Sequence, residues 1–374
     1  MKTRFASAVL AATLSGCSGH QLIPPPALFP VTTAWKATLA ALSDPPLGTD
    51  GTRLFVATRD GKLQAFSLAD GTLLWTAETG AGHLGAAPGV LAIRADDGVL
   101  TRVDPETGKL LWQNESGIAG KLPPLIDSDF VFVGGAGLAA LSSVDGRKLW
   151  TATDGADVTT PPLASGARLF VGEEDGTLRC RDRATGGSLW TFKTSSALRA
   201  PLVLDAGPRL LFGTTEGHFV AVSPDKGRRA WRWKIGADVQ HAATLLKDEV
   251  LFVTLEDVLY ALDRTNGHMR WRAVLPSRPL AAPILTSNAV VVACHDDNLV
   301  GFDARSGRRL GAMTTPAEIR TPPLIVADRL YIGLRDHTIL ALTLDQTPAK
   351  DEVVPQKRPG QGKPVTDKSR YPQP

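Results

Sequence analysis

Short apolar runs separated by turn residues extend along most of the chain, and one arrangement of them recurs. The apolar run 53–56 (RLFV) is followed by Asp60-Gly61 and then by the alternating segment 63–67 (LQAFS). Alternation of apolar and polar residues is typical of a β-strand, and Asp-Gly accepts the positive φ of a two-residue hairpin turn. No segment shows a competing helical period. The pattern therefore predicts an all-β protein of short strands joined by tight turns.

A second recurring feature is a turn that contains glycine, followed four residues later by tryptophan. Successive tryptophans of this kind are 37 to 41 residues apart, which is the length of a four-stranded propeller blade. In one further unit the turn Ser306-Gly307 is kept, but Gly311 stands in the tryptophan position. Seven of the eight tryptophans belong to the repeat: Trp35, Trp75, Trp112, Trp150, Trp190, Trp231 and Trp271.

The two ends of the repeat complement each other. The last unit, residues 322–344, supplies three strands and stops without a fourth, whereas residues 32–38 around Trp35 form a fourth strand with no preceding three. We therefore predict an eight-bladed β-propeller of four-stranded blades, over residues 32–345, in which the N-terminal strand completes the last blade. Such closure removes the exposed sheet edges that invite aggregation.

The N-terminus has the features of an export signal. Lys2 and Arg4 precede an apolar stretch that is too short to span a membrane, and residues 14–17 (LSGC) resemble the bacterial lipobox. We predict a signal peptide over 1–16 and a lipid on Cys17. The alternative is an ordinary secretory signal with a coincidental cysteine. In the lipoprotein pattern, serine after the modified cysteine favours the outer membrane.

Segments of different composition flank the repeat. Residues 17–31, which contain four prolines, are expected to be a flexible tether, and the Pro/Lys/Arg-rich residues 346–374 a disordered tail. Loss of residues 1–16 lowers the formal net charge from +3 to +1, because Lys2 and Arg4 leave with them. The basic pI therefore gives no support for nucleic-acid binding.

The repeat resembles the pyrroloquinoline quinone (PQQ)-like propeller repeat. The pattern Ala/Cys-x-Asp/Ser-x-x-Thr/Asp-Gly-x-x-x-Trp is matched at 65–75, 180–190, 221–231 and 261–271. Together with the lipobox, it makes the chain similar to the BamB-type lipoproteins of the outer-membrane β-barrel assembly machinery. This resemblance implies a monomeric, non-catalytic scaffold without cofactors, anchored at the periplasmic face of the outer membrane, whose partners are envelope proteins of that machinery. A repeat is specific for fold and weak for function.

The PQQ-like repeat also raises the possibility of an enzyme. Quinoprotein dehydrogenases with this repeat are longer and carry calcium-ligating acids, a catalytic Asp and often a vicinal disulfide, none of which is visible here. A small-molecule-binding or degenerate quinoprotein propeller, and a lipoprotein adaptor of another envelope complex, remain alternatives. His295-Asp296-Asp297 falls where other units place a hairpin turn, so a turn is favoured over a metal site.

Two further features have both structural and functional interpretations. Cys180 and Cys294 lie in strand-like segments of different repeats, which favours two buried thiols over a disulfide. Arg228, Arg229 and Arg232 make the fourth strand of a later blade basic. Charge on an outer strand discourages edge pairing; alternatively, these arginines form a rim that binds an acidic partner or lipid headgroups.

Overall fold

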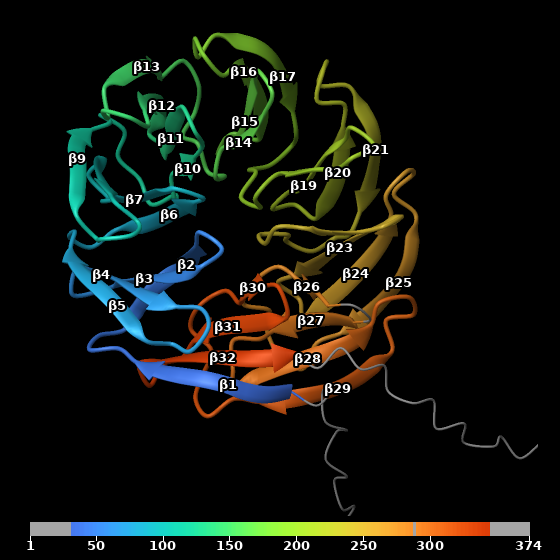
Figure 1. Cartoon of the computed structure of the whole chain (residues 1–374). Coiled ribbons are helices and arrows are strands. Elements are labelled where there is room, and N and C mark those ends of the chain that lie inside the picture. Colours follow the sequence, from blue (N-terminus) through green and yellow to red (C-terminus); the bar gives the residue numbers. More distant parts are fainter. Residues whose placement is uncertain (1–30, 287–288, 345–374) are drawn as a thin grey trace, which may run out of the picture.

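The computed structural model describes residues 31–286 and 289–344. In this part the chain forms eight antiparallel four-stranded sheets that stand as blades around a central axis (Figure 1). Within the described ranges, no helix has the length and apolar character needed to cross a membrane. The expected eight-bladed, all-β propeller is confirmed.

The first seven blades each consist of four consecutive strands, ordered from the axis outward. Blade 1 consists of β2 (Ser43–Thr49), β3 (Arg53–Thr58), β4 (Lys62–Ser67) and β5 (Leu73–Glu78), and blade 2 of β6 (His83–Ala87), β7 (Val90–Arg94), β8 (Val99–Val103) and β9 (Leu110–Glu115). Blade 3 consists of β10 (Leu125–Ile126), β11 (Phe130–Gly135), β12 (Gly137–Ser142) and β13 (Lys148–Ala152). Blade 4 consists of β14 (Leu163–Ser165), β15 (Arg168–Gly172), β16 (Thr177–Asp182) and β17 (Ser188–Lys193). Blade 5 consists of β18 (Val203–Leu204), β19 (Leu210–Gly213), β20 (His218–Val222) and β21 (Arg229–Lys234). Blade 6 consists of β22 (Thr244–Leu246), β23 (Glu249–Thr254), β24 (Val258–Asp263) and β25 (Met269–Val274). Blade 7 consists of β26 (Ile284–Leu285), β27 (Ala289–Ala293), β28 (Asn298–Asp303) and β29 (Arg309–Thr314).

The eighth blade combines both ends of the described chain. Its three inner strands are β30 (Leu324–Val326), β31 (Arg329–Gly333) and β32 (Thr338–Leu344), and β1 (Val31–Thr38) pairs antiparallel with β32 as the outermost strand. Trp35 lies opposite Ala341 in this register. The N-terminal strand therefore closes the ring as the sequence predicts, and blade 8 has no unpaired outer edge on β32.

Each repeat tryptophan attaches its blade to the next one. The indole Nε1 of Trp75, in blade 1, donates a hydrogen bond to the carbonyl oxygen of Pro105 in blade 2 at 3.1 Å, and the ring packs on Gly108. Gly108 has a φ of +72°, and a Cβ added there would lie 2.6 Å from the ring. Both facts require glycine in the turn. The same hydrogen bond to the following blade is made by Trp35, Trp112, Trp150, Trp190 and Trp231.

The middle strands of each blade supply most of the core, and the outer strands add mainly their tryptophans. Phe170 and Cys180 of blade 4 pack with Phe212 and Val220 of blade 5, and all four side chains are buried. Equivalent clusters fill the spaces between other neighbouring blades, so apolar burial holds the ring together all the way round. What remains for recognition is the pair of loop-bearing faces, the axial channel and the outer rim.

Candidate functional site

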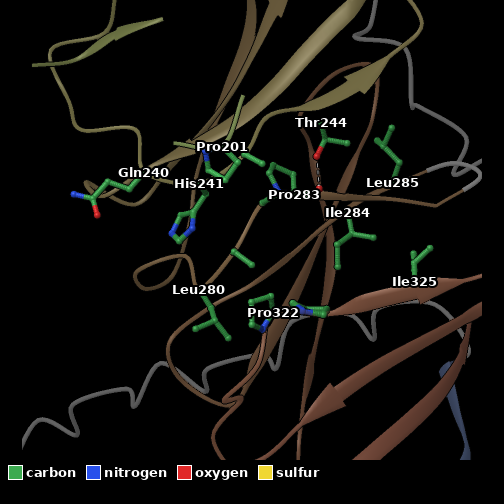
Figure 2. A pocket seen from close by; sticks show the side chains of 14 residues that line it. Pro201, Gln240, His241, Thr244, Leu280, Pro283, Ile284, Leu285, Pro322 and Ile325 are labelled. Carbon is green, nitrogen blue, oxygen red and sulfur yellow. Dashed lines mark hydrogen bonds between the residues drawn. The ribbon is translucent and has the colours of Figure 1, made fainter. Parts of the chain in front are cut away.

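A cavity of about 480 Å³ lies near the propeller axis, where loops and inner strands of blades 5 to 8 converge (Figure 2). His241 and Gln240 occupy one side of it, and Ile284, Leu285 and Ile325 occupy the other. The walls are otherwise mostly aliphatic side chains and prolines. A concave, mainly apolar site with a few polar groups is the usual form of a small-molecule pocket.

The polar side chains of this cavity are engaged in holding its walls. Nε2 of His241 donates a hydrogen bond to the carbonyl oxygen of Pro279 at 3.2 Å, and Oγ1 of Thr244 donates to that of Pro283 at 2.5 Å. Burial lowers the pKa of His241, and the neighbouring His295 and Arg278 lower it further. His241 is therefore neutral near pH 7 and links the start of blade 6 to the start of blade 7.

The cavity does not fit the PQQ cofactor from which the repeat takes its name. That quinone carries several carboxylates and is held with calcium, so it needs cationic side chains and acidic ligands. The residues that line the cavity include no Arg, Lys, Asp or Glu. In the described ranges, no three His, Cys, Asp or Glu side chains are grouped closely enough to hold a metal ion.

The segment His295-Asp296-Asp297 forms the turn between β27 and β28. Asp296 accepts hydrogen bonds from Oγ of Ser277 at 2.6 Å and from the backbone N–H of Asn298 at 2.8 Å. A carboxylate that accepts a backbone N–H two residues later is a common way to stabilise a turn. The geometry is that of a hairpin tip, in agreement with the interpretation favoured from the sequence.

Both internal cysteines are buried and free, as the sequence favours. Burial raises the pKa of the Cys180 thiol to about 12 and that of Cys294 to about 11. Because the thiolate is the reactive form, neither cysteine is suited to nucleophilic chemistry at neutral pH. Cys17, the expected lipid-attachment residue, lies outside the described residues, as do the predicted signal peptide, most of the tether and the tail.

The basic residues singled out from the sequence lie on the outer rim. Arg229 and Arg232 belong to β21, Arg228 to the turn before it, and all three are exposed. No carboxylate of the described residues forms an ion pair with them within 4 Å. The positions therefore leave three positive charges available to a partner.

One buried charged residue was not identified from the sequence. Arg94, at the end of β7, is fully buried and donates to the carbonyl oxygens of Leu122 and Gly134 at 2.9 and 2.8 Å, and to that of Ile118 at 2.9 Å. Gly135 leaves room for the guanidinium, because a Cβ there would lie 3.1 Å from it. The available signal was an arginine at the end of an otherwise apolar strand.

Several known proteins share this repeat and architecture. The chain is 29% identical over 182 residues to an outer membrane protein assembly factor BamB of Nitrosomonas eutropha, which covers 44% of this chain and 42% of the relative. It is 24% identical over 229 residues to BamB of Moranella endobia, and this alignment covers 54% of this chain and 58% of the relative. The chain thus spans about half the length of the curated relatives it matches.

Solved structures show the same fold at lower identity. BamB from Moraxella catarrhalis superposes with a TM-score of 0.72 at 18% identity, covering 84% of this chain and 99% of that one. A quinohemoprotein alcohol dehydrogenase from Comamonas testosteroni gives a TM-score of 0.69 at 13% identity, and the superposition covers 90% of this chain and 78% of that one. These likenesses establish the propeller and do not by themselves separate a scaffold from an enzyme.

A family model matches nearly the whole of the described chain. The model described as outer membrane protein assembly factor BamB matches residues 32–121, 96–241 and 216–352, and these segments together extend over the whole propeller. With the repeat tryptophans in place and an axial cavity that does not fit the quinone, the chain belongs to the BamB family of outer membrane protein assembly factors.

Proposed function

We propose that this chain is a non-catalytic scaffold that assists the assembly and insertion of outer-membrane β-barrel proteins. The observation that carries the proposal is the match of the BamB family model along the entire propeller. The site geometry is compatible with it, because the axial cavity is lined by apolar side chains and by polar groups already bonded to its walls.

The architecture suits a protein that acts by binding other proteins. A closed ring of eight blades is a rigid support, and loops on a rigid support commonly carry recognition. A lipid on Cys17 would keep the ring at the periplasmic face of the outer membrane. Confinement near a membrane raises the effective concentration toward neighbouring membrane proteins, so a contact of modest affinity is sufficient.

The anchor is tested by Cys17→Ala. This variant should move from the membrane to the soluble periplasmic fraction, and mass spectrometry of the purified wild-type protein should find a lipidated N-terminal cysteine at position 17. Replacing the adjacent serine, Ser18→Ala, is the matched control and should leave the protein with the membranes. Unmodified Cys17, or a mature N-terminus elsewhere, would contradict the anchor.

The assembly role is tested by deletion and affinity purification. Loss of the protein should lower porin levels in the outer membrane, and wild-type protein tagged at the C-terminus should recover the central barrel-assembly protein from solubilised membranes. If neither occurs, the assembly role is wrong, and the adaptor of a different envelope complex becomes the better hypothesis.

A second candidate function is supported by the axial cavity. Its volume of about 480 Å³ and its apolar walls suit a small, uncharged ligand. Titration with PQQ and calcium should show no saturable binding, because no cation lines the cavity. Stoichiometric binding of the quinone would overturn the scaffold assignment in favour of a quinoprotein-like propeller.

A further inference from the structure

The outermost strands of the propeller differ in character between its two halves. In β5 and β9 of blades 1 and 2, the positions before the tryptophan hold leucines that are 49 to 61% exposed: Leu73, Leu74, Leu110 and Leu111. In β21, β25 and β29 of blades 5 to 7, arginines take three of the six equivalent positions: Arg229, Arg270 and Arg309. The fold is the same in both halves, so the difference is not required by the blade itself.

The basic half carries a group of cations that the protein leaves unpaired. Two acidic residues of these blades are paired with other arginines: Asp225 with Arg168 of blade 4 at 2.9 Å, and Asp263 with Arg270. Asp303 lies near Arg308 but accepts its hydrogen bonds from Ser306 and the backbone. The exposed cations are nine residues, which we call the basic arc: Lys226, Arg228, Arg229, Arg232, Lys234, Arg272, Arg305, Arg308 and Arg309. Among the described residues, none of these nine forms an ion pair within 4 Å.

The basic arc extends over the outermost strands of three successive blades. Figure 1 shows β21, β25 and β29 on the outside of three successive blades. β25, the middle strand of the three, also carries exposed apolar side chains: Met269 is 46% exposed and Val274 is 77% exposed. Trp233 points to the opposite face of β21 from Arg232 and Lys234, and it is half-buried against Tyr260 with the ring centroids 5.5 Å apart. Cations mixed with exposed apolar side chains are typical of surfaces that contact a lipid interface.

The N-terminal segment joins the described structure beside the basic arc. Val31, the first residue of β1, packs in the same apolar cluster as Met313 of β29. Figure 1 accordingly shows the start of β1 close to β29. Val31 comes fourteen residues after Cys17, and an extended segment of that length spans at most about 50 Å. An anchor at Cys17, which is part of the proposed function, would thus hold this side of the disc near the bilayer.

From these observations we propose that the basic arc docks on a bilayer that contains anionic phospholipid headgroups. A lipid surface fits better than an acidic protein for two reasons. The arc is spread over three blades on the outside of a disc, and its middle strand, β25, carries exposed apolar side chains that an acidic protein surface would leave exposed. Docking would set the ring on its edge, with the apolar leucines of blades 1 and 2 and both loop faces free for protein partners.

The test uses the full chain with Cys17→Ala, so that the lipid anchor does not mask the contact. The measurement is co-sedimentation with vesicles of phosphatidylcholine alone or with one third phosphatidylglycerol. We expect binding only to the anionic vesicles, with a strong decrease on addition of salt. Arg228→Gln/Arg229→Gln/Arg232→Gln should weaken the partition coefficient on the order of a hundredfold, since each basic residue contributes roughly fivefold at such a surface.

A matched control removes three exposed positive charges from the rim of blades 2 and 3. Lys109→Gln/Arg147→Gln/Lys148→Gln should bind anionic vesicles within about threefold of the parent chain, because local charge and not net charge governs the contact. Both triple variants change exposed side chains, and equal melting temperatures would verify that each is folded.

Three outcomes would overturn the proposal: equal binding to neutral and anionic vesicles, equal losses in the two triple variants, or binding to soluble poly-glutamate without binding to vesicles. The last result would assign the arc to an acidic protein instead. Vesicle binding does not depend on barrel assembly, so a failure here is distinct from unchanged porin levels in the deletion strain.

Discussion

At the scale of single residues, a glycine and a tryptophan from neighbouring blades form the recurring contact of this protein. The glycine is needed twice over: its φ lies in the left-handed region, and the indole of the preceding blade occupies the space of a Cβ. These two requirements can be separated, because Gly51 has a similar φ of +93° with nothing within 4 Å of an added Cβ.

Gly108→Ala should destabilise the protein more than Gly51→Ala. Both substitutions impose a positive φ on alanine, which costs about 1–2 kcal/mol. Only Gly108→Ala also forces a methyl group against Trp75, and such overpacking adds about 1–3 kcal/mol. The free energies of unfolding in guanidinium chloride give the comparison, and equal losses would show that the indole contact does not constrain the turn.

His241 gives the axial cavity a predictable dependence on pH. Its pKa in the folded protein is lowered by burial, so the unfolded chain takes up the proton first as the pH falls. Its contribution to stability is complete above the unfolded pKa of about 6.5 and is lost as the pH falls through the lower folded value. His241→Gln should therefore reduce the fall in melting temperature between pH 7.5 and pH 5.

A neighbouring residue provides the control for this effect. Gln240→Asn changes the lining of the same cavity without removing a titrating group, and should keep the wild-type difference between the two pH values. If His241→Gln shows the same fall in melting temperature as the wild type, the buried imidazole does not govern the pH response.

At the scale of elements, most strands have equivalents in every blade, but β7 ends differently. Its last residue, Arg94, extends into blade 3 and donates to three backbone carbonyls there and in the preceding loop. Burial lowers the pKa of Arg94 to about 10, so the guanidinium stays charged at neutral pH even without a carboxylate partner. The β7 terminus thus holds two blades together through the backbone.

Arg94→Met should cost about 2–4 kcal/mol of unfolding free energy. Relief from burying a charge offsets part of the loss, but three buried carbonyl oxygens would be left without a donor, at about 1–3 kcal/mol each. Arg147→Met, at a side chain 72% exposed, is the control and should change stability by less than about 0.5 kcal/mol. Equal stability of the two variants, measured by chemical denaturation, would refute the role given to Arg94.

At the scale of the whole molecule, eight blades become one unit because the first strand belongs to the last blade. β1 pairs along its length with β32 and brings Trp35 against Tyr331, with the ring centroids 5.7 Å apart. Trp35 Nε1 also donates to the carbonyl oxygen of Leu68 in blade 1 at 3.0 Å. Residues far apart in sequence are thereby joined where the ring would otherwise open.

Deletion of residues 31–38 should lower the melting temperature strongly, since it exposes the edge of β32 and removes a buried tryptophan. Trp35→Ala alone should cost about 3–5 kcal/mol. Lys36→Ala, on the exposed face of the same strand, should leave stability close to that of the wild type. A deletion variant that melts with the full chain would mean that the ring is closed by other contacts.

Much of this architecture follows from the sequence alone. The spacing of turn glycines and tryptophans determines the number of blades, because each repeat can bury its apolar faces only against a neighbour. The incomplete last unit and the isolated first strand determine how the ring closes. The isolated context of Cys180 and Cys294 is sufficient to favour buried thiols, which the structure confirms.

Other features were decided only by the tertiary structure, because they depend on residues from different blades. Three carbonyls around Arg94 come together only when blades 2 and 3 pack, and the cavity at His241 exists only where four blades converge. The sequence gives the arginines of each outer strand separately. The closed ring places these strands on three successive blades, and this gathers the separate charges on one side of the perimeter.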